Sequence, residues 1–202
     1  MARYTGPRNK IARRLGQDLG LKTNPKLLER RLNTLPGQHG KRGKGKVSEF
    51  GTQLAEKQKA KAIYGVLERQ FKNYYSLAAR TPQATGEVLL SLLERRLDNV
   101  IFRLGFVPTR RAARQLISHG NVMVNNKKLD IPSYQVSENE VISLSPTAIN
   151  IPYIKELLAQ KDFTVPQWLT RKASVGKMVR LPKREETTEA IQEQLIVEFY
   201  SR

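Results

Sequence analysis

The sequence predicts an α+β fold that is preceded by a basic arm. Apolar residues recur at helical spacing through residues 51–80 and again through residues 92–119. Short strand patterns follow at residues 122–129 and 140–144, separated by turn residues. With 202 residues, the chain can bury roughly 70% of its unfolded surface, which is enough for one or two hydrophobic cores.

Residues 1–46 form the predicted arm, because they contain few large apolar side chains and are interrupted by proline and glycine. They hold 13 Lys and Arg residues against two acids, which gives a net charge of +11 out of the chain's +18. We expect an extended segment that becomes ordered on a polyanion. The alternative is a flexible solubilising tail, which would not need the leucines that lie among these charges.

Residues 40–47, at the end of the arm, have the glycine spacing and the lysine of a nucleotide-binding phosphate loop. Val47 stands where such a loop needs a Ser or Thr hydroxyl for magnesium, and no hydrophobic strand precedes the segment. We therefore expect a mobile loop that grips phosphate, and no nucleotide hydrolysis. Its cations are Lys41, Arg42, Lys44 and Lys46.

Residues 51–80 are expected to be helical, and Thr81 and Pro82 end the pattern. Glu68 and Lys72 are spaced to pair across one helical turn. We interpret the aromatic residues of this stretch as core, although aromatic rings can also stack on unpaired bases. The residues on the apolar side are Ile63, Leu67, Phe71, Tyr74, Tyr75 and Ala78.

The first helix of residues 92–119 has an apolar stripe that runs from Leu93 to Leu104. Arg95, Arg96 and Arg103 lie off this stripe, so we expect them on the opposite, exposed side. The helix preceding this unit begins near Thr85–Glu87, and the pattern leaves open whether it breaks near Glu94.

Pro108 disfavours helical backbone at the residue before it, and Thr109 is a competent N-cap for a second helix. This helix carries Arg110, Arg111 and Arg114 on one side, where like charges repel one another. A polyanion explains this crowding, because each guanidinium can donate two hydrogen bonds to phosphate oxygens. The alternative is a solvated cationic face without a partner.

Gly120 is placed to end the second helix in a left-handed conformation. Residues 122–124, Asn125-Asn126 and residues 127–129 then predict a strand, a turn and a strand. Further along, we expect a strand at 140–144, a short helix around 154–158, and strand structure at 195–200. Trp168 is expected to be a core or interdomain anchor.

The overall charge points to the class of partner. A net charge of +18 and a sequence pI near 10.3 favour nucleic acid or an anionic membrane surface. No apolar run approaches the ~18 residues of a membrane span, and the basic N-terminus lacks the apolar core of a signal peptide. Cysteine is absent, which excludes disulfides and thiolate metal sites and fits the cytosol.

Residues capable of catalysis are sparse. The two histidines, His39 and His119, lie in separate segments, and a metal would need more ligands than these provide. Adjacent carboxylates at 138/140 and 185/186 have basic neighbours, so solvated salt bridging is the expected interpretation. We therefore expect no enzyme activity, no cofactor, no metal and no small-molecule substrate.

Residues 93–100, 103–106, 113–120 and 124–125 resemble the small RNA-binding domain named after the fourth protein of the small ribosomal subunit. That domain also occurs in pseudouridine synthases, a tyrosyl-tRNA synthetase and a heat-shock protein, so alone it implies only RNA binding. The flanking segments resemble the bacterial-type family of that ribosomal protein itself. These segments are residues 1–7, 36–40, 64–71 and 193–201.

The resemblance implies a division into a basic arm at 1–46, a helical domain at 47–91 completed by 180–202, and an RNA-binding domain inserted at 92–179. It implies a primary binder of small-subunit ribosomal RNA, at a junction of the 5′ domain, that nucleates assembly and contributes to decoding accuracy. Residues 41–46 would lie near the channel through which messenger RNA enters, beside neighbouring ribosomal proteins, in a cytoplasmic or organellar ribosome.

Relatives of another subclass carry a four-cysteine zinc site in the arm, which this chain lacks, so no zinc is expected. Two alternatives stay open, an accessory RNA-binding module of an RNA-modifying enzyme and a helix-turn-helix DNA binder. The expected RNA contacts are the cationic side chains of the arm, the two arginine-bearing helices and the hairpin. They are Arg3, Arg8, Lys10, Arg13, Arg14, Lys41, Arg42, Lys44, Lys46, Arg95, Arg96, Arg103, Arg110, Arg111, Arg114, His119, Lys127 and Lys128.

Overall fold

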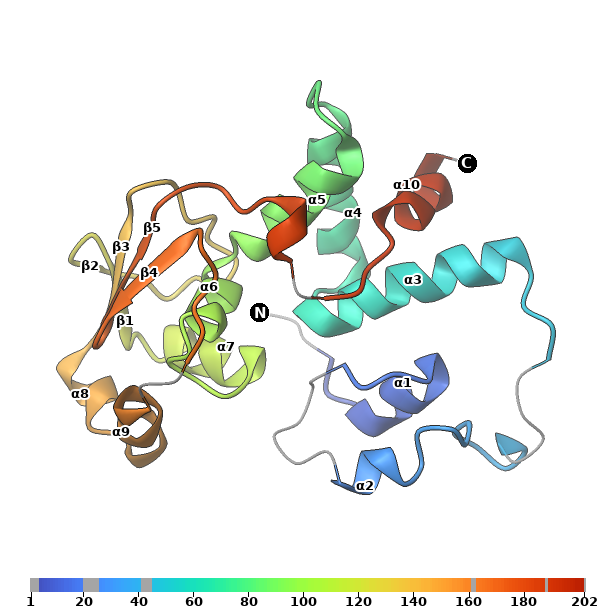
Figure 1. The fold of residues 1–202 in the computed structure, drawn as a ribbon, viewed down its shortest axis with the longest axis horizontal. Coiled ribbons are helices and arrows are strands. Elements are labelled where there is room, and N and C mark those ends of the chain that lie inside the picture. Colours follow the sequence, from blue (N-terminus) through green and yellow to red (C-terminus); the bar gives the residue numbers. More distant parts are fainter. Residues whose placement is uncertain (1–3, 20–25, 41–44, 161–162, 188, 202) are drawn as a thin grey trace. The chain divides into compact units, whose positions relative to one another are not determined.

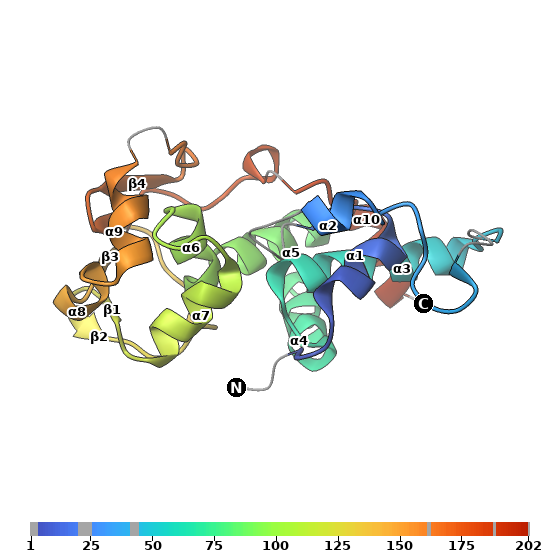
Figure 2. The same cartoon turned by 90° about the horizontal axis from the view of Figure 1, so that it is seen from below.

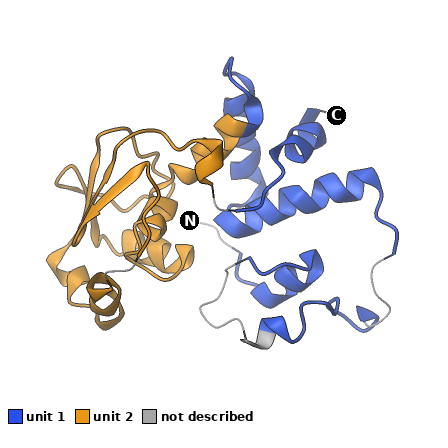
Figure 3. Cartoon of the chain, viewed as in Figure 1, with its two compact units in different colours: residues 1–86, 189–202 blue, residues 87–188 orange. Residues whose placement is uncertain are grey.

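The computed structural model describes residues 4–19, 26–40, 45–160, 163–187 and 189–201. The chain forms two compact units, residues 1–86 with 189–202 (unit 1) and residues 87–188 (unit 2), which Figure 3 distinguishes by colour. Unit 1 is helical in its described parts, whereas unit 2 combines helices with an antiparallel sheet (Figure 1). The predicted α+β class is confirmed.

Unit 1 brings the two ends of the chain together. Helix α3 (Glu49–Tyr64) packs against α10 (Glu193–Ser201), which lies alongside it in Figure 1. Ser48 caps α3, because its Oγ accepts a hydrogen bond from the Gly51 amide at 3.2 Å. The strand expected at residues 195–200 is wrong, since the i, i+3/i+4 spacing of Ile196, Phe199 and Tyr200 places these side chains on α3 and α4 only in a helix.

The helix expected over residues 51–80 is two helices. Gly65 ends α3 with a φ of 60°, a left-handed conformation that suits glycine, and α4 (Glu68–Ala79) follows. Glu68 does not pair with Lys72 as expected. It accepts hydrogen bonds from Lys57 at 2.9 Å and Lys61 at 2.6 Å, because the break places the first residue of α4 beside the C-terminal half of α3.

The aromatic residues of α4 differ in burial, since Phe71 belongs to the core as expected, whereas Tyr74 and Tyr75 are half-buried. Phe71 is fully buried, and the Tyr75 and Tyr200 rings lie 4.6 Å apart between centroids. Tyr200 donates a hydrogen bond to Glu68 at 2.6 Å. Burial and this hydrogen bond raise the pKa of Tyr200 above its usual value.

Glu68 makes the stability of unit 1 dependent on pH. Burial alone would raise its pKa, but hydrogen bonds from Lys61, Tyr200 and Lys57 outweigh burial and lower the pKa from 4.5 to about 2. Because the folded-state pKa is depressed, the stabilisation is complete above pH 4.5 and is lost as the pH falls toward 2. We expect Glu68→Gln to cost about 1 kcal/mol at neutral pH, a discounted value because the side chain is 44% exposed.

The measurement is denaturant unfolding of the full chain at pH 7, 4 and 2.5, followed by far-UV circular dichroism. The difference between wild type and Glu68→Gln should shrink as the pH falls. A difference that stayed constant across this range would show that the Glu68 carboxylate charge does not contribute. Glu185→Gln, which changes an exposed carboxyl of unit 2, is the matched control.

The arm contains more local structure than its composition predicts. It forms two short helices, α1 (Arg8–Leu15) and α2 (Lys26–Glu29), and α1 packs against both α2 and α3 (Figure 2). Leu19 and Leu28 are buried. The Arg13 guanidinium donates hydrogen bonds to the carbonyl oxygens of Thr34 at 2.9 Å and Leu35 at 3.0 Å. Leu19 and Leu28 are thus two leucines of the arm that pack, which a solubilising tail would not need.

Unit 2 starts within α5 (Thr85–Glu94), from its third residue onward, and continues with α6 (Leu97–Arg103) and α7 (Arg110–Ser118). Thr109 caps α7 as expected, with the Ala112 amide donating to its Oγ1 at 3.2 Å. Helices α6 and α7 lie side by side in both views (Figures 1 and 2). The continuous pattern from Leu93 to Leu104 is interrupted at Arg96, which has extended backbone and bridges to Gln135.

The described part of unit 2 has a five-stranded antiparallel sheet in the order β2-β1-β3-β5-β4. Asn125 and Asn126, with φ of 48° and 64°, form the expected turn between β1 and β2. Strands β4 and β5 were not expected from the sequence. The strands are β1 (Val122–Val124), β2 (Lys127–Lys128), β3 (Val141–Leu144), β4 (Leu169–Lys172) and β5 (Val175–Met178).

Helices α8 (Pro146–Ile149) and α9 (Pro152–Ala159) follow β3, and α9 is the short helix that was expected. Trp168 is 1% exposed and belongs to the core that α6, α7 and the sheet share, so it is a core residue of unit 2. A one-turn 3-10 helix at Arg184–Glu186 completes the unit. Among the described residues, no helix is both long enough and apolar enough to cross a bilayer.

Candidate nucleic-acid interface

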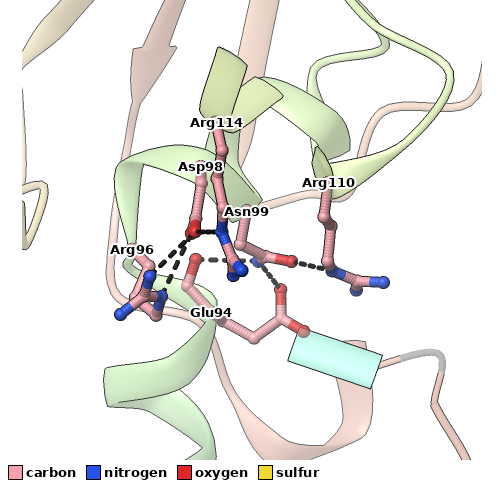
Figure 4. A network of polar contacts seen from close by, with 6 residues as sticks. All are labelled: Glu94, Arg96, Asp98, Asn99, Arg110 and Arg114. Atoms are coloured by element: carbon pink, nitrogen blue, oxygen red, sulfur yellow. Dashed lines mark hydrogen bonds and ion pairs between the residues drawn. The ribbon is translucent and has the colours of Figure 1, made fainter. Parts of the chain in front are cut away.

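Two buried carboxylates organise the arginines of unit 2. Asp98, which is 1% exposed, accepts two hydrogen bonds from Arg96, at 3.1 Å from Nε and 2.8 Å from Nη2. Arg114 donates to the same carboxylate from Nε at 2.6 Å (Figure 4). Because a buried carboxylate is costly without a counter-ion, these guanidiniums are required by the fold.

Glu94, the second buried carboxylate, lies at the end of α5. Arg103 binds it through two hydrogen bonds, from Nη2 at 2.7 Å and from Nε at 3.0 Å. The Asn99 amide donates to it at 2.6 Å, and the Asn99 Oδ1 in turn accepts from Nε of Arg110 at 2.7 Å. Figure 4 shows the part of this chain that runs from Glu94 through Asn99 to Arg110, and so links α5, α6 and α7.

Arg96 and Arg103 therefore do not lie on an exposed face, and this corrects the expectation for both residues. Arg96 is 1% exposed and Arg103 is 9% exposed. The expectation assumed one continuous helix. The backbone is extended at Arg96, so the side chains before and after this break do not follow the same helical periodicity. Both guanidiniums are occupied as counter-ions, and we remove them from the proposed RNA contacts.

Arg110 and Arg114 are half-buried and are held through Nε, the nitrogen nearest the stem. The Arg110 guanidinium also lies over the Phe102 ring, 4.5 Å from its centroid. In Figure 4, the terminal nitrogens of Arg110 point away from Asn99. Arg95 donates from Nε to the Val136 carbonyl at 3.0 Å. These contacts restrict the rotamers of three half-buried arginines, Arg95, Arg110 and Arg114.

Further exposed side chains lie on α7, at its end and on the hairpin. Arg111, Lys127 and Lys128 are exposed cations, and His119 is also exposed. The stem of Lys128 lies over Gly120, where a Cβ would be 2.1 Å from its Cε. Gly120 has a φ of 69° and ends α7 as expected, so the close approach brings a hairpin lysine to the negative end of that helix.

The expected contacts in the arm have varied surroundings. Lys10, Arg14 and Lys46 are exposed, whereas Arg8 is half-buried and Arg13 is occupied by backbone carbonyls. The remaining expected contacts lie outside the described residues. They are Arg3, Lys41, Arg42 and Lys44.

Sequence reasoning missed Asp98 and Asn99, which position the arginines. The available signal was two polar residues directly beside the apolar stripe that starts at Leu97. Within the described parts of the chain, no three His, Asp or Glu side chains gather as a metal site would require. Of the adjacent carboxylates, Glu186 forms an ion pair with Arg180, as expected.

Comparison with known proteins shows which family the chain resembles. Residues 3–94 match the family model of the ribosomal protein S4/S9 N-terminal domain, and residues 95–142 match that of the S4 domain. The small ribosomal subunit protein uS4 of Herpetosiphon aurantiacus is 50% identical over 211 aligned residues, covering all of both chains. That of Thermodesulfovibrio yellowstonii is 51% identical over 212 aligned residues, again covering all of both. The chain belongs to the uS4 family.

The two uS4 family regions meet between Glu94 and Arg95. Glu94 belongs to the first region, whereas Asn99 and Arg103, which bind its carboxylate, belong to the S4 domain. The buried network therefore connects Glu94, the last residue of the N-terminal family region, to two buried residues of the S4 domain. The uS4 relatives are ribosomal proteins and not enzymes, so the accessory-module and DNA-binder alternatives are not favoured.

Proposed function

We propose that this chain is a structural constituent of the small ribosomal subunit that binds its RNA through the cations of unit 2 and the arm. The observation that carries the proposal is the buried network, which holds the half-buried Arg110 and Arg114 in place on α7. Membership of the uS4 family supports it, as does the net charge of +18. No bond is made or broken in this function.

The mechanism is electrostatic and geometric. The network contains four guanidiniums, of Arg96, Arg103, Arg110 and Arg114, but only two carboxylates, so it keeps an excess of two positive charges. Phosphate contacts release condensed counter-ions from RNA, and this favours binding at moderate salt. Contacts to phosphates recognise the shape of the folded RNA. Base sequence is less accessible to the protein, because A-form RNA hides its base edges in a narrow major groove.

Finer features of the function follow from the family resemblance. The RNA target would be a junction in the 5′ domain of small-subunit RNA, where binding nucleates assembly. Residues 41–46, four of which are Lys or Arg, would lie near incoming messenger RNA and neighbouring ribosomal proteins and so contribute to decoding accuracy. Glycine backbone between these cations suits a loop that follows a moving strand.

The proposal predicts that exposed cations of unit 2 bind RNA without supporting the fold. We expect the triple variant Arg111→Gln, Lys127→Gln and Lys128→Gln to bind a small-subunit RNA transcript about tenfold more weakly at ~0.15 M salt. Its thermal unfolding should match that of the wild type, since exposed substitutions usually cost within ~0.5 kcal/mol each. Filter binding across a salt series measures the first effect, and circular dichroism measures the second.

Duplex DNA is the competitor in the same assay. It should displace the transcript only at large excess, because the proposed contacts follow the shape of a folded RNA. Displacement on equal terms would contradict the RNA assignment and favour a general polyanion binder. Failure of the wild-type chain to bind the transcript at all would end the proposal.

A further inference from the structure

The outer face of the sheet in unit 2 exposes apolar side chains. Helices α6 and α7 lie on the other side of this sheet and share its core (Figure 1). An antiparallel sheet with one face in water usually alternates apolar residues inward and polar residues outward. Strand β5 and its continuation differ, because every second residue from Val175 to Leu181 is exposed, and three of these four residues are apolar.

These residues form one patch across two strands. Val141 on β3 pairs with Lys177 on β5, and Lys177 lies between Val175 and Val179 on the outward side of that strand. Diagonal neighbours on antiparallel strands are roughly 7–8 Å apart, so the three valines surround the lysine stem. The members of this outer patch are 37–46% exposed, and they are Val141, Val175, Val179 and Leu181.

Hydrogen bonds hold the continuation of β5 in place. The Val179 amide donates to the Trp168 carbonyl oxygen at 2.9 Å, and the Leu181 amide donates to the Glu138 carboxylate at 3.1 Å. The exposed side chains are therefore presented on a fixed backbone. Single exposed apolar residues are ordinary on a protein surface, whereas a contiguous patch marks an interaction site.

Lysines border the outer patch. Lys172 on β4 lies opposite Val175, and Lys177 lies among the valines. Both lysines are exposed, and neither side chain forms a hydrogen bond or ion pair with a described residue. Lys183 continues the outward alternation two residues after Leu181. An apolar centre with a cationic border is complementary to an apolar surface that is bordered by carboxylates.

We infer that the outer patch is a docking surface for an acidic amphipathic helix of another protein. Helices are the elements that cover sheet faces in layered domains, and α6 and α7 already cover the opposite face. Folded RNA fits less well, because an apolar centre offers no partner to phosphate oxygens. A second copy of the chain also fits less well, because a symmetric contact would bring like charges together. The inference goes beyond the proposed RNA binding and does not rest on it.

The probe for this surface is a synthetic amphipathic helix of about 18 residues, with Leu on one face and Glu along both borders. Fluorescence anisotropy measures its binding to the full chain at ~0.15 M salt. We expect the combined variant Val175→Thr, Val179→Thr and Leu181→Gln to bind the probe about tenfold more weakly, because apolar contact area is lost. Threonine keeps the β-branched shape that suits a strand.

The matched control makes the same kinds of change at exposed apolar residues outside the outer patch. It combines Val47→Thr, Leu77→Gln and Ile131→Thr, and it should bind the probe within about twofold of the wild type. Both variants keep the net charge of the wild type, so general attraction of an acidic probe to a basic chain affects them alike. Unchanged melting temperatures show that the fold is retained.

Zero-length cross-linking with a carbodiimide tests the location of the probe. This reagent joins a carboxylate to a lysine amine only where the two groups are in contact. We expect cross-links from the probe to Lys172 and Lys177, and far fewer to Lys10, Lys46 and Lys155, which are exposed elsewhere on the chain. Cross-links spread evenly over these lysines would overturn the inference.

Other occupants of the face would give different results. Equal affinities of the two triple variants, or no binding by the wild type, would overturn the docking surface. We expect the probe and a small-subunit transcript to bind the chain together, and complete displacement of the probe would assign the face to RNA. A concentration-dependent dimer in sedimentation, lost in the outer-patch variant alone, would assign the face to a second copy.

Discussion

Replacing Asp98 by alanine is expected to lower the free energy of unfolding of unit 2 by ~3–5 kcal/mol, the cost of leaving a buried guanidinium unpaired. Asp98 accepts two hydrogen bonds from the fully buried Arg96 and a third from Arg114, so its loss affects two elements at once. Arg96 is 1% exposed, so bulk water does not reach its guanidinium to replace the lost carboxylate.

Trp168 makes this loss measurable in the full chain. It is the chain's single tryptophan and is buried in the core of unit 2, so its fluorescence reports the unfolding of that unit in denaturant. Asp130→Ala, at an exposed position of the same unit, is the matched control and should change stability by within ~0.5 kcal/mol. Equal midpoints for both variants would show that Asp98 does not act as the counter-ion.

Neutralising the exposed cations of the arm should have the largest effect on RNA affinity. Replacing Lys10, Arg14, Arg30, Arg31 and Lys46 by glutamine removes up to five phosphate contacts, and the slope of log affinity against log salt should fall by about 4. At ~0.15 M salt, this corresponds to a loss of about 10²–10³ in affinity. Filter binding of the small-subunit transcript over a salt series measures both quantities.

Substitution is preferable to deletion of the arm, because Leu19 and Leu28 are buried and Arg13 holds two carbonyl oxygens. The five exposed side chains can change while these internal contacts stay. Circular dichroism should then show the helix content and melting temperature of the wild type. A salt slope equal to that of the wild type would support the solubilising-tail interpretation.

Local signals in the sequence were sufficient for several elements of unit 2. Thr109 and Gly120 mark the two ends of α7, and Asn125-Asn126 marks the hairpin turn, because capping and left-handed backbone depend on the residue type itself. Trp168 was correctly assigned to a core. These local features depend on a few consecutive residues, so they can be predicted from the sequence without knowledge of the tertiary structure.

Other elements depended on partners far along the chain. Residues 195–200 contain Ile, Val and aromatic side chains that suit a strand, yet they form α10 because α3 and α4 offer a surface for a helical face. Strand β5 contains glycine and lysine and pairs with β3, and β4 pairs in turn with β5, so long-range pairing completes both strands. The break between α3 and α4 likewise decided where Glu68 points.

The sequence by itself determined that this is a basic α+β chain of the uS4 type, because charge, helical spacing and family motifs are all carried by residue identity. It did not determine which arginines meet the solvent. Arg96 and Arg111 are the same residue type in neighbouring helical segments, but one neutralises a buried carboxylate and the other is exposed. This difference in exposure arises only when α5, α6 and α7 pack together. The packing buries Glu94 and Asp98, and a buried carboxylate is stable only beside a cationic partner.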